Sequence, residues 1–103
     1  MSSTVPFTER VIQIIKKIPK GSVITYGQAA AWAGNSRAAR QVAYILHSSS
    51  EKHGLPWHRV INGKGMIALR KGRGAELQKQ LLLAEGIDID NSGRIDLKVF
   101  SWL

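Results

Sequence analysis

The run Pro56-Trp57-His58-Arg59-Val60 holds the side chains of this chain with the clearest capacity for chemistry. A histidine moves protons near neutral pH and an arginine binds anions, but covalent catalysis also needs a nucleophile. The indole of Trp57 is not one, because its nitrogen lone pair belongs to the aromatic system, and the chain contains no cysteine. Thiolate chemistry is therefore excluded. The three histidines lack metal-ligand spacing, so we expect no metal and no other cofactor.

The charge of the chain is strongly basic and uneven. Fifteen Lys and Arg against seven Asp and Glu give a net charge of +8. Residues 1–75 carry twelve basic and two acidic side chains, a net +10, whereas residues 76–103 carry three and five, a net −2. A localised basic surface favours a polyanionic partner, most simply a nucleic acid. The alternative is that the basic excess only aids solubility.

The length of 103 residues fits a single domain over residues 1–103, and 44% hydrophobic residues suffice for a core. No apolar run approaches the roughly 20 residues that a membrane helix needs, and the N-terminus shows no signal-peptide pattern. With the absence of cysteine, these features lead us to expect an intracellular, cytoplasmic protein without membrane contact.

Residues 25–48 have the pattern of a helix-turn-helix. Thr25-Tyr26-Gly27-Gln28 matches a capping box that opens a helix through Ala33, and Gly34-Asn35 breaks it. Ser36 is then placed to cap a second helix over 37–48. The outer face of that helix is polar and basic, formed by Arg37, Arg40, Gln41, Tyr44 and His47. The alternative is an ordinary helical hairpin whose arginines are merely solvated.

The remaining pattern predicts a small, mostly helical α+β domain with short β hairpins. We expect helices over 7–18 and 75–85, the second packing through Leu77, Leu81 and Ala84. Polar residues 48–54 read as a loop, and residues 70–74 as a basic loop. Hairpins are expected around 62–63 and 91–93, and the C-terminal residues Phe100, Trp102 and Leu103 are expected to pack back onto the body.

Three separated motifs of the chain resemble the O6-alkylguanine-DNA alkyltransferases, in the family's order. Pro56 to Val60 is similar to the active-site motif Pro-Cys-His-Arg-Val, with Trp57 in place of the cysteine. Tyr26-Gly27-Gln28 and residues 33–42 resemble the two helices of the family's helix-turn-helix, and residues 82–86 the helix end that carries a glutamate partner of the active-site histidine. The resemblance implies the fold of the alkyltransferase C-terminal DNA-binding domain, and the alkyltransferase-like group that binds the lesion without alkyl transfer.

The resemblance also implies which residues meet DNA. Arg40 falls on the family's arginine finger, which occupies the space vacated by a flipped base, and Tyr26 crowds the rotating phosphate. Trp57 offers an apolar face to the flipped base, while His58 and Glu85 are assigned no catalytic role. The expected DNA-binding residues are Thr25, Tyr26, Ser36, Arg37, Ala38, Arg40 and Gln41. The expected lesion-pocket residues, built around motif 56–60 and loop 70–74, are Tyr26, Trp57, Val60, Arg70 and Lys71.

The expected function is damage recognition by a monomeric, nucleoid-associated, non-enzymatic protein. Its expected partners are double-stranded DNA containing O6-alkylguanine and the damage-recognition proteins of nucleotide excision repair. The chain departs from the family pattern in the basic loop 70–74, at Ser49 and at Tyr44. Tyr44 stands at a position often held by glycine in the family. Two alternatives stay open. One is a lesion-blind helix-turn-helix protein or transcription regulator, and the other an enzyme with another nucleophile, such as a glycosylase or a histidine-based alkyltransferase.

Overall fold

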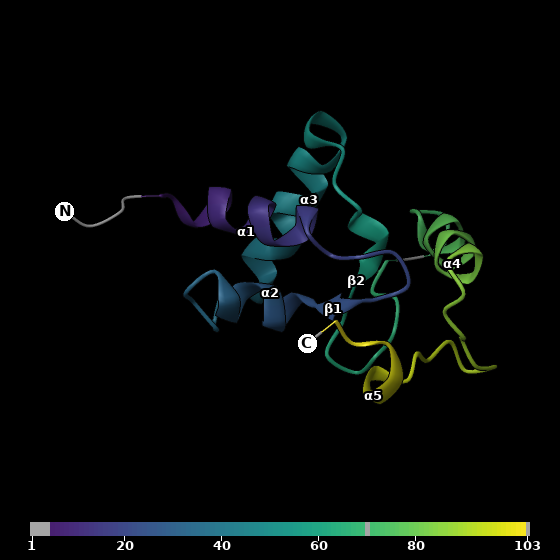
Figure 1. The fold of residues 1–103 in the computed structure, drawn as a ribbon. Coiled ribbons are helices and arrows are strands. Elements are labelled where there is room, and N and C mark those ends of the chain that lie inside the picture. The colour runs from purple at the N-terminus through teal and green to yellow at the C-terminus, as the bar shows by residue number, and fades with distance from the viewer. Residues whose placement is uncertain (1–4, 70, 103) are drawn as a thin grey trace.

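Three helices pack together on one side of the molecule and a fourth lies on the other, with two very short strands between them (Figure 1). The computed structural model describes residues 5–69 and 71–102. The elements in chain order are α1 (Phe7–Lys16), β1 (Ile24–Thr25), α2 (Tyr26–Trp32), α3 (Ala39–His53), the 3₁₀ helix η1 (Trp57–Arg59), β2 (Val60–Ile61), α4 (Ala75–Ala84) and α5 (Leu97–Phe100). Among the described residues, no helix has the length and apolar character to cross a membrane.

The strands β1 and β2 pair in parallel, with Ile24 opposite Val60 and Thr25 opposite Ile61. Side chains of a strand alternate between its two faces, so the pair separates two hydrophobic clusters. Ile24 and Val60 belong to the cluster formed with α1, α2 and α3. Val23 and Ile61 belong to the cluster formed with α4 and the C-terminal segment. The strands thereby join the helix-turn-helix to the second half of the chain.

The predicted β hairpins are wrong within the described residues, although their turns form. Asn62 closes a turn, since its backbone N–H donates to the Met66 carbonyl at 2.9 Å. Met66 then pairs with Arg94 rather than continuing a hairpin with β2. The C-terminal segment packs back as expected for Phe100 and Trp102, and the N–H of Trp102 donates to the Val23 carbonyl at 2.9 Å. Leu103 lies outside the described residues.

The capping box at the start of α2 is confirmed. The Thr25 hydroxyl accepts from the Gln28 N–H at 3.0 Å, and the Gln28 side chain accepts from the Thr25 N–H at 2.9 Å. The start of α3 differs from the prediction, because no side chain caps it and Ser36 lies in the preceding turn. There the Asn35 side chain accepts from the Arg37 N–H instead, at 3.1 Å.

Helix α3 is longer than its sequence pattern indicates, and the loop predicted from residue 48 is wrong. The helix continues through Ser48 to His53 and ends at Gly54, whose positive φ of 61° suits glycine at a helix C-terminus. Inside the helix, the Ser48 hydroxyl donates to the Ile45 carbonyl at 3.3 Å, so this polar side chain finds a partner within the helix itself. The extra turns build one wall of the cavity described below.

Helix α4 buries a different face from the one predicted. Leu77 is 51% exposed and Ala84 is also exposed, whereas Gln78 is 1% exposed and buried beside Leu82. Burial of an amide is favourable only when it is hydrogen-bonded. The Gln78 amide nitrogen donates to the carbonyls of His58 and Val60, both at 3.0 Å. This pair of bonds fixes α4 to the backbone of the Trp57 motif, and Leu77 and Leu81 line the cavity described below.

Candidate functional site

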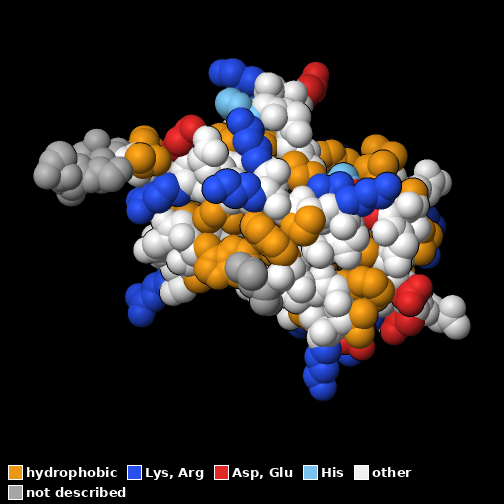
Figure 2. Space-filling model, viewed as in Figure 1, with side chains coloured by type: hydrophobic (Ala, Val, Ile, Leu, Met, Phe, Trp, Pro, Cys, Tyr) orange, Lys and Arg blue, Asp and Glu red, His pale blue; other side chains and the backbone are white. Residues whose placement is uncertain are grey.

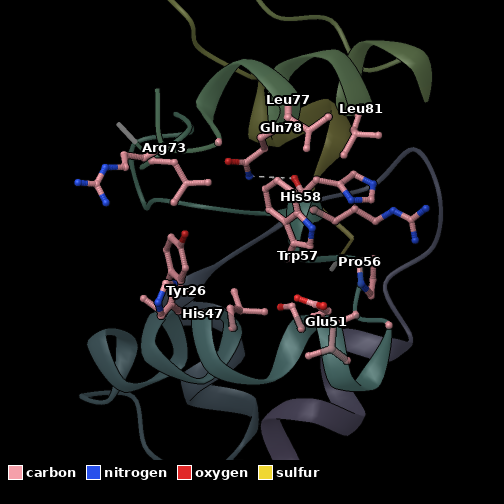
Figure 3. Close-up of a pocket in the computed structure, with 18 of the residues that line it drawn as sticks. Tyr26, His47, Glu51, Pro56, Trp57, His58, Arg73, Leu77, Gln78 and Leu81 are labelled. Carbon is pink, nitrogen blue, oxygen red and sulfur yellow. Dashed lines mark hydrogen bonds between the residues drawn. The ribbon is translucent and has the colours of Figure 1, made fainter. Parts of the chain in front are cut away.

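A large cavity of about 1060 Å³ lies between α3 and α4, with the Trp57 motif between them. Figure 3 shows side chains of α2 and α3 on one side, side chains of α4 on the other and the Trp57 indole between the two groups. The labelled residues below Trp57 are Tyr26, His47 and Glu51, and those above it are Leu77, Gln78 and Leu81. The volume lies at the upper end of the range for small-molecule sites, so the cavity is large enough for a purine base with a substituent.

The structure brings some of the predicted pocket residues together and not others. Tyr26 and Trp57 both line the cavity. Val60 does not, because it is fully buried beneath the motif with its carbonyl bonded to Gln78. Lys71 is exposed and lies outside the lining, and Arg70 lies outside the described residues. Leu69, Arg73 and Gly74 are the residues of that loop region that line the cavity.

Tyr26 stands at the start of α2, where the helix-turn-helix meets the cavity. Burial raises the pKa of the Tyr26 hydroxyl, so the group stays protonated and able to donate a hydrogen bond. Thr25 is placed differently from its expected DNA-binding role. It is buried in β1, and its hydroxyl is engaged in the capping box.

The outer face of the helix-turn-helix forms a second, shallower depression of about 470 Å³. Of the expected DNA-binding residues, Arg37, Ala38, Arg40 and Gln41 line it. All of these except Ala38 are exposed, and Ser36 is exposed beside them in the turn before α3. The core side of α3 is formed by Val42, Ile45 and Leu46, as the sequence predicts. The arginines therefore point away from the core, as contact with a polyanion requires.

Basic side chains predominate on much of the surface. Figure 2 shows Lys and Arg side chains over most of the face in view, with acidic groups among them in the upper part and further acidic side chains at the lower right. This arrangement matches the charge imbalance between residues 1–75 and 76–103. Residues 1–75, which include the helix-turn-helix, therefore carry the basic excess of the chain.

The carboxylate of Glu85 is the centre of a polar network behind Trp57. Its Oε2 lies 2.6 Å from His58 Nε2 and 2.8 Å from Arg59 Nη2. Its Oε1 accepts from Arg59 Nε and from the backbone N–H of Gly21, each at 3.0 Å. Arg59 also donates through Nη1 to the Ile18 carbonyl at 2.7 Å. The carboxylate therefore joins the loop after α1, the Trp57 motif and the end of α4.

The pairing of His58 with Glu85 was predicted from the family resemblance. The hydrogen bonds that Arg59 and the Gly21 N–H donate to the same carboxylate were not predicted. Partial burial raises the pKa of Glu85, but hydrogen bonds from Arg59, His58 and the Gly21 N–H outweigh it and lower the pKa from 4.5 to about 2. The network holds a carboxylate charge beside a histidine but has no thiol to activate, because the chain contains no cysteine. In the part of the chain that is described, no group of three or more His, Cys, Asp or Glu could hold a metal ion.

The lowered pKa of Glu85 predicts acid sensitivity. A group with a folded-state pKa of about 2 and an ordinary value of 4.5 stabilises the fold fully above pH 4.5 and loses that contribution as the pH falls toward 2. We expect a loss on the order of 3 kcal/mol in the free energy of unfolding across that window. Urea unfolding measured between pH 2 and pH 7 checks this. In the Glu85→Gln variant the profile should be flatter, and an equally steep profile would assign the acid sensitivity to other carboxylates.

Comparisons with known proteins agree with this geometry. Residues 6–87 match the family described as 6-O-methylguanine DNA methyltransferase, DNA binding domain. The chain is 49% identical over 96 residues to the DNA base-flipping protein of Escherichia coli K12, covering 93% of this chain and 74% of that protein. It is 36% identical over 102 residues to Alkyltransferase-like protein 1 of Schizosaccharomyces pombe, covering 93% of this chain and 94% of the relative.

A solved structure gives the same result for the fold. The alkyltransferase-like protein of Schizosaccharomyces pombe in complex with damaged DNA containing O6-carboxymethylguanine superposes with a TM-score of 0.83 at 33% identity, covering 94% of each chain. The small, mostly helical fold is thus that of the alkyltransferase DNA-binding domain, in a chain that contains no cysteine. The chain belongs to the 6-O-methylguanine DNA methyltransferase family and, within it, to the alkyltransferase-like base-flipping proteins.

Proposed function

We propose that this protein binds duplex DNA through α2 and α3 in the minor groove, flips O6-alkylguanine into the cavity at Trp57 and holds it there without alkyl transfer. The observation that carries the proposal is the cavity itself. It lies between α3 and α4, is lined by an indole and no thiol, and shares helix α3 with the depression lined by the exposed arginines of the helix-turn-helix. A modified base cannot be inspected inside the stack, so recognition requires that it be extruded.

The placement of three side chains supports the flipping step. Arg40 projects from the exposed face of α3 and is free to fill the space of the extruded base. Tyr26 belongs to both the helix-turn-helix and the cavity lining, so it stands on the route of the rotating nucleotide. Trp57 offers a base-stacking surface worth roughly 1–3 kcal/mol, which offsets much of the few kcal/mol that extrusion costs. The relatives named for base flipping and the complex with alkylated DNA support the same reading.

Binding without repair leaves the lesion in place, so the proposal includes a further step. We assign the protein the role of a monomeric marker that passes the site to damage-recognition proteins of nucleotide excision repair, in the compartment that holds the DNA. The chain has no thiol to accept the alkyl group, so a second activity must remove the lesion.

Equilibrium binding to two duplexes that differ only in one O6-methylguanine tests the proposal. At a fixed, stated salt concentration we expect at least tenfold tighter binding to the lesion duplex, by fluorescence anisotropy. The Arg40→Ala variant should lose most of that preference, because nothing then fills the vacated stack. Arg40→Lys keeps the charge and separates electrostatics from insertion, and Arg94→Ala removes an exposed arginine of the C-terminal segment as a matched control.

Two outcomes would replace the proposal with one of its alternatives. Equal affinities of the wild-type protein for the two duplexes would indicate a lesion-blind helix-turn-helix protein. Loss of the alkyl group or base from the DNA, or a gain in protein mass after incubation, would indicate an enzyme with another nucleophile. If lesion preference is present but unchanged in Arg40→Ala, the finger role of Arg40 is wrong while recognition stands.

A further inference from the structure

Tyr44 is the most exposed of the large hydrophobic side chains described in the structure, with 72% of its surface accessible. It makes no contribution to the core of α3, which is formed by Val42, Ile45 and Leu46. Among the described residues its hydroxyl has no hydrogen-bond partner and its ring has no aromatic neighbour. An aromatic ring with a phenolic hydroxyl suits a surface that is half apolar and half wet.

The position of Tyr44 on α3 places it beside the proposed arginine finger. Tyr44 follows Arg40 by four residues, so the two side chains share one face about 6 Å apart along the helix axis. Both line the shallow depression, together with Arg37 and Gln41. The spacing is close to the roughly 6 Å width of the minor groove. With the face of α3 that carries Arg40 turned to the minor groove, Tyr44 therefore reaches a wall of the groove, whether or not a base is flipped.

The helix geometry also shows which wall it reaches. The cavity is lined on α3 by Ala43, Leu46, His47, Ser50 and Glu51, and the first four of these lie together on one flank of the helix. Tyr44 is rotated by about 100° from Ala43 and lies on the other side of Arg40 from that flank. The flipped nucleotide leaves the duplex toward the cavity, so the damaged strand runs along the cavity flank. The opposite flank, with Tyr44, faces the complementary strand.

We propose that Tyr44 contacts the sugar–phosphate backbone of the undamaged strand and clamps it while the damaged nucleotide is extruded. The ring packs against the apolar face of a deoxyribose, and the hydroxyl donates a hydrogen bond to a phosphate oxygen. Contacts of this kind position a protein on DNA without reading its sequence. The inference rests on the proposed minor-groove binding, and it adds a contact that is independent of the lesion and specific to the duplex.

Binding of Tyr44→Ala to three DNA ligands tests the inference. For the lesion duplex and the intact duplex we expect the same loss of affinity, about fivefold or more, with an unchanged ratio between the two. For the single lesion strand alone we expect affinity equal to that of the wild type, because no complementary strand is present. The affinity of Tyr44→Phe for duplex DNA should lie between the affinities of the wild type and of Tyr44→Ala. The salt dependence of binding should not change, since tyrosine neutralises no phosphate.

The controls make each outcome decisive. Tyr44 is exposed, so its replacement should leave the melting temperature unchanged. Val99→Ala truncates another exposed hydrophobic side chain, 66% accessible on α5, and should bind all three ligands like the wild type. Unchanged or tighter duplex binding by Tyr44→Ala overturns the inference, and so does an equal loss on the single strand. In either case the wild-type preference for the lesion duplex still tests the proposed function separately.

Discussion

Replacing Glu85 with alanine is expected to lower the free energy of unfolding by about 3–5 kcal/mol, the range for breaking a buried ion pair from one side. The side chain of Glu85 is 9% exposed and accepts hydrogen bonds from His58, Arg59 and the Gly21 N–H. Its removal leaves an arginine charge and a backbone donor without their partner at a site largely closed to water. Small domains have free energies of unfolding of about 5–15 kcal/mol, so the expected loss is a large part of the total stability of the fold.

Thermal and urea unfolding at pH 7 measure this effect. A loss of 3 kcal/mol corresponds to a fall of at least about 12 °C in the melting temperature of a domain of this size. Asp88→Ala removes an exposed carboxylate three residues away and serves as the matched control, with an expected change within about 0.5 kcal/mol. If both variants unfold at the same temperature, the carboxylate network is dispensable and the assignment of a structural role to Glu85 fails.

Replacing Trp57 with alanine is expected to weaken binding to the lesion duplex by about 10- to 100-fold, in line with the 1–3 kcal/mol of a base–aromatic contact. Trp57 is half-buried in the cavity, and it packs edge-on to His58 with ring centroids 6.1 Å apart. Without the indole the flipped base loses its contact surface in a cavity that is already wide. Binding to the intact duplex should change much less, because the base then stays in the stack.

Anisotropy titrations with lesion and intact duplexes measure the loss. Trp57→Phe should keep part of the preference, since a smaller aromatic face remains. Trp32→Ala is the matched control, because Trp32 is a partly exposed tryptophan that pairs with Trp102, at a ring-centroid distance of 5.8 Å, and takes no part in the cavity. Equal loss of affinity for lesion and intact duplexes in Trp57→Ala would show that the indole acts on DNA binding in general rather than on the flipped base.

The network around Glu85 explains why residues that resemble an activation apparatus persist in a chain without a nucleophile. Arg59 and the Gly21 N–H bind the same carboxylate as His58, and the three donors come from two separated segments. The network stabilises the fold because it holds the Trp57 motif against α4 and against the loop after α1. The network therefore has a structural role that requires no nucleophile, and the prediction for Glu85→Ala tests that role.

The sequence by itself determined the features that depend on residue type or on neighbours along the chain. The absence of cysteine and the indole at position 57 exclude thiolate transfer whatever the fold. The capping box at Thr25 and Gln28 and the apolar period of α1 depend on neighbours along the chain, so the sequence alone predicts them. The pairing of His58 with Glu85 came from the family resemblance and is confirmed at 2.6 Å.

Tertiary structure alone decided the features that join distant segments. The turns of α3 beyond residue 48 are polar, so periodicity did not reveal them, yet they build a wall of the cavity. Gln78 is buried on α4 because its amide satisfies two carbonyls 18 and 20 residues away, a pairing that no pattern within the helix encodes. The Gly21 N–H meets Glu85 across 64 residues. Hydrogen bonds of buried groups are settled by the packing of the whole chain, since each donor takes the acceptor that folding brings to it.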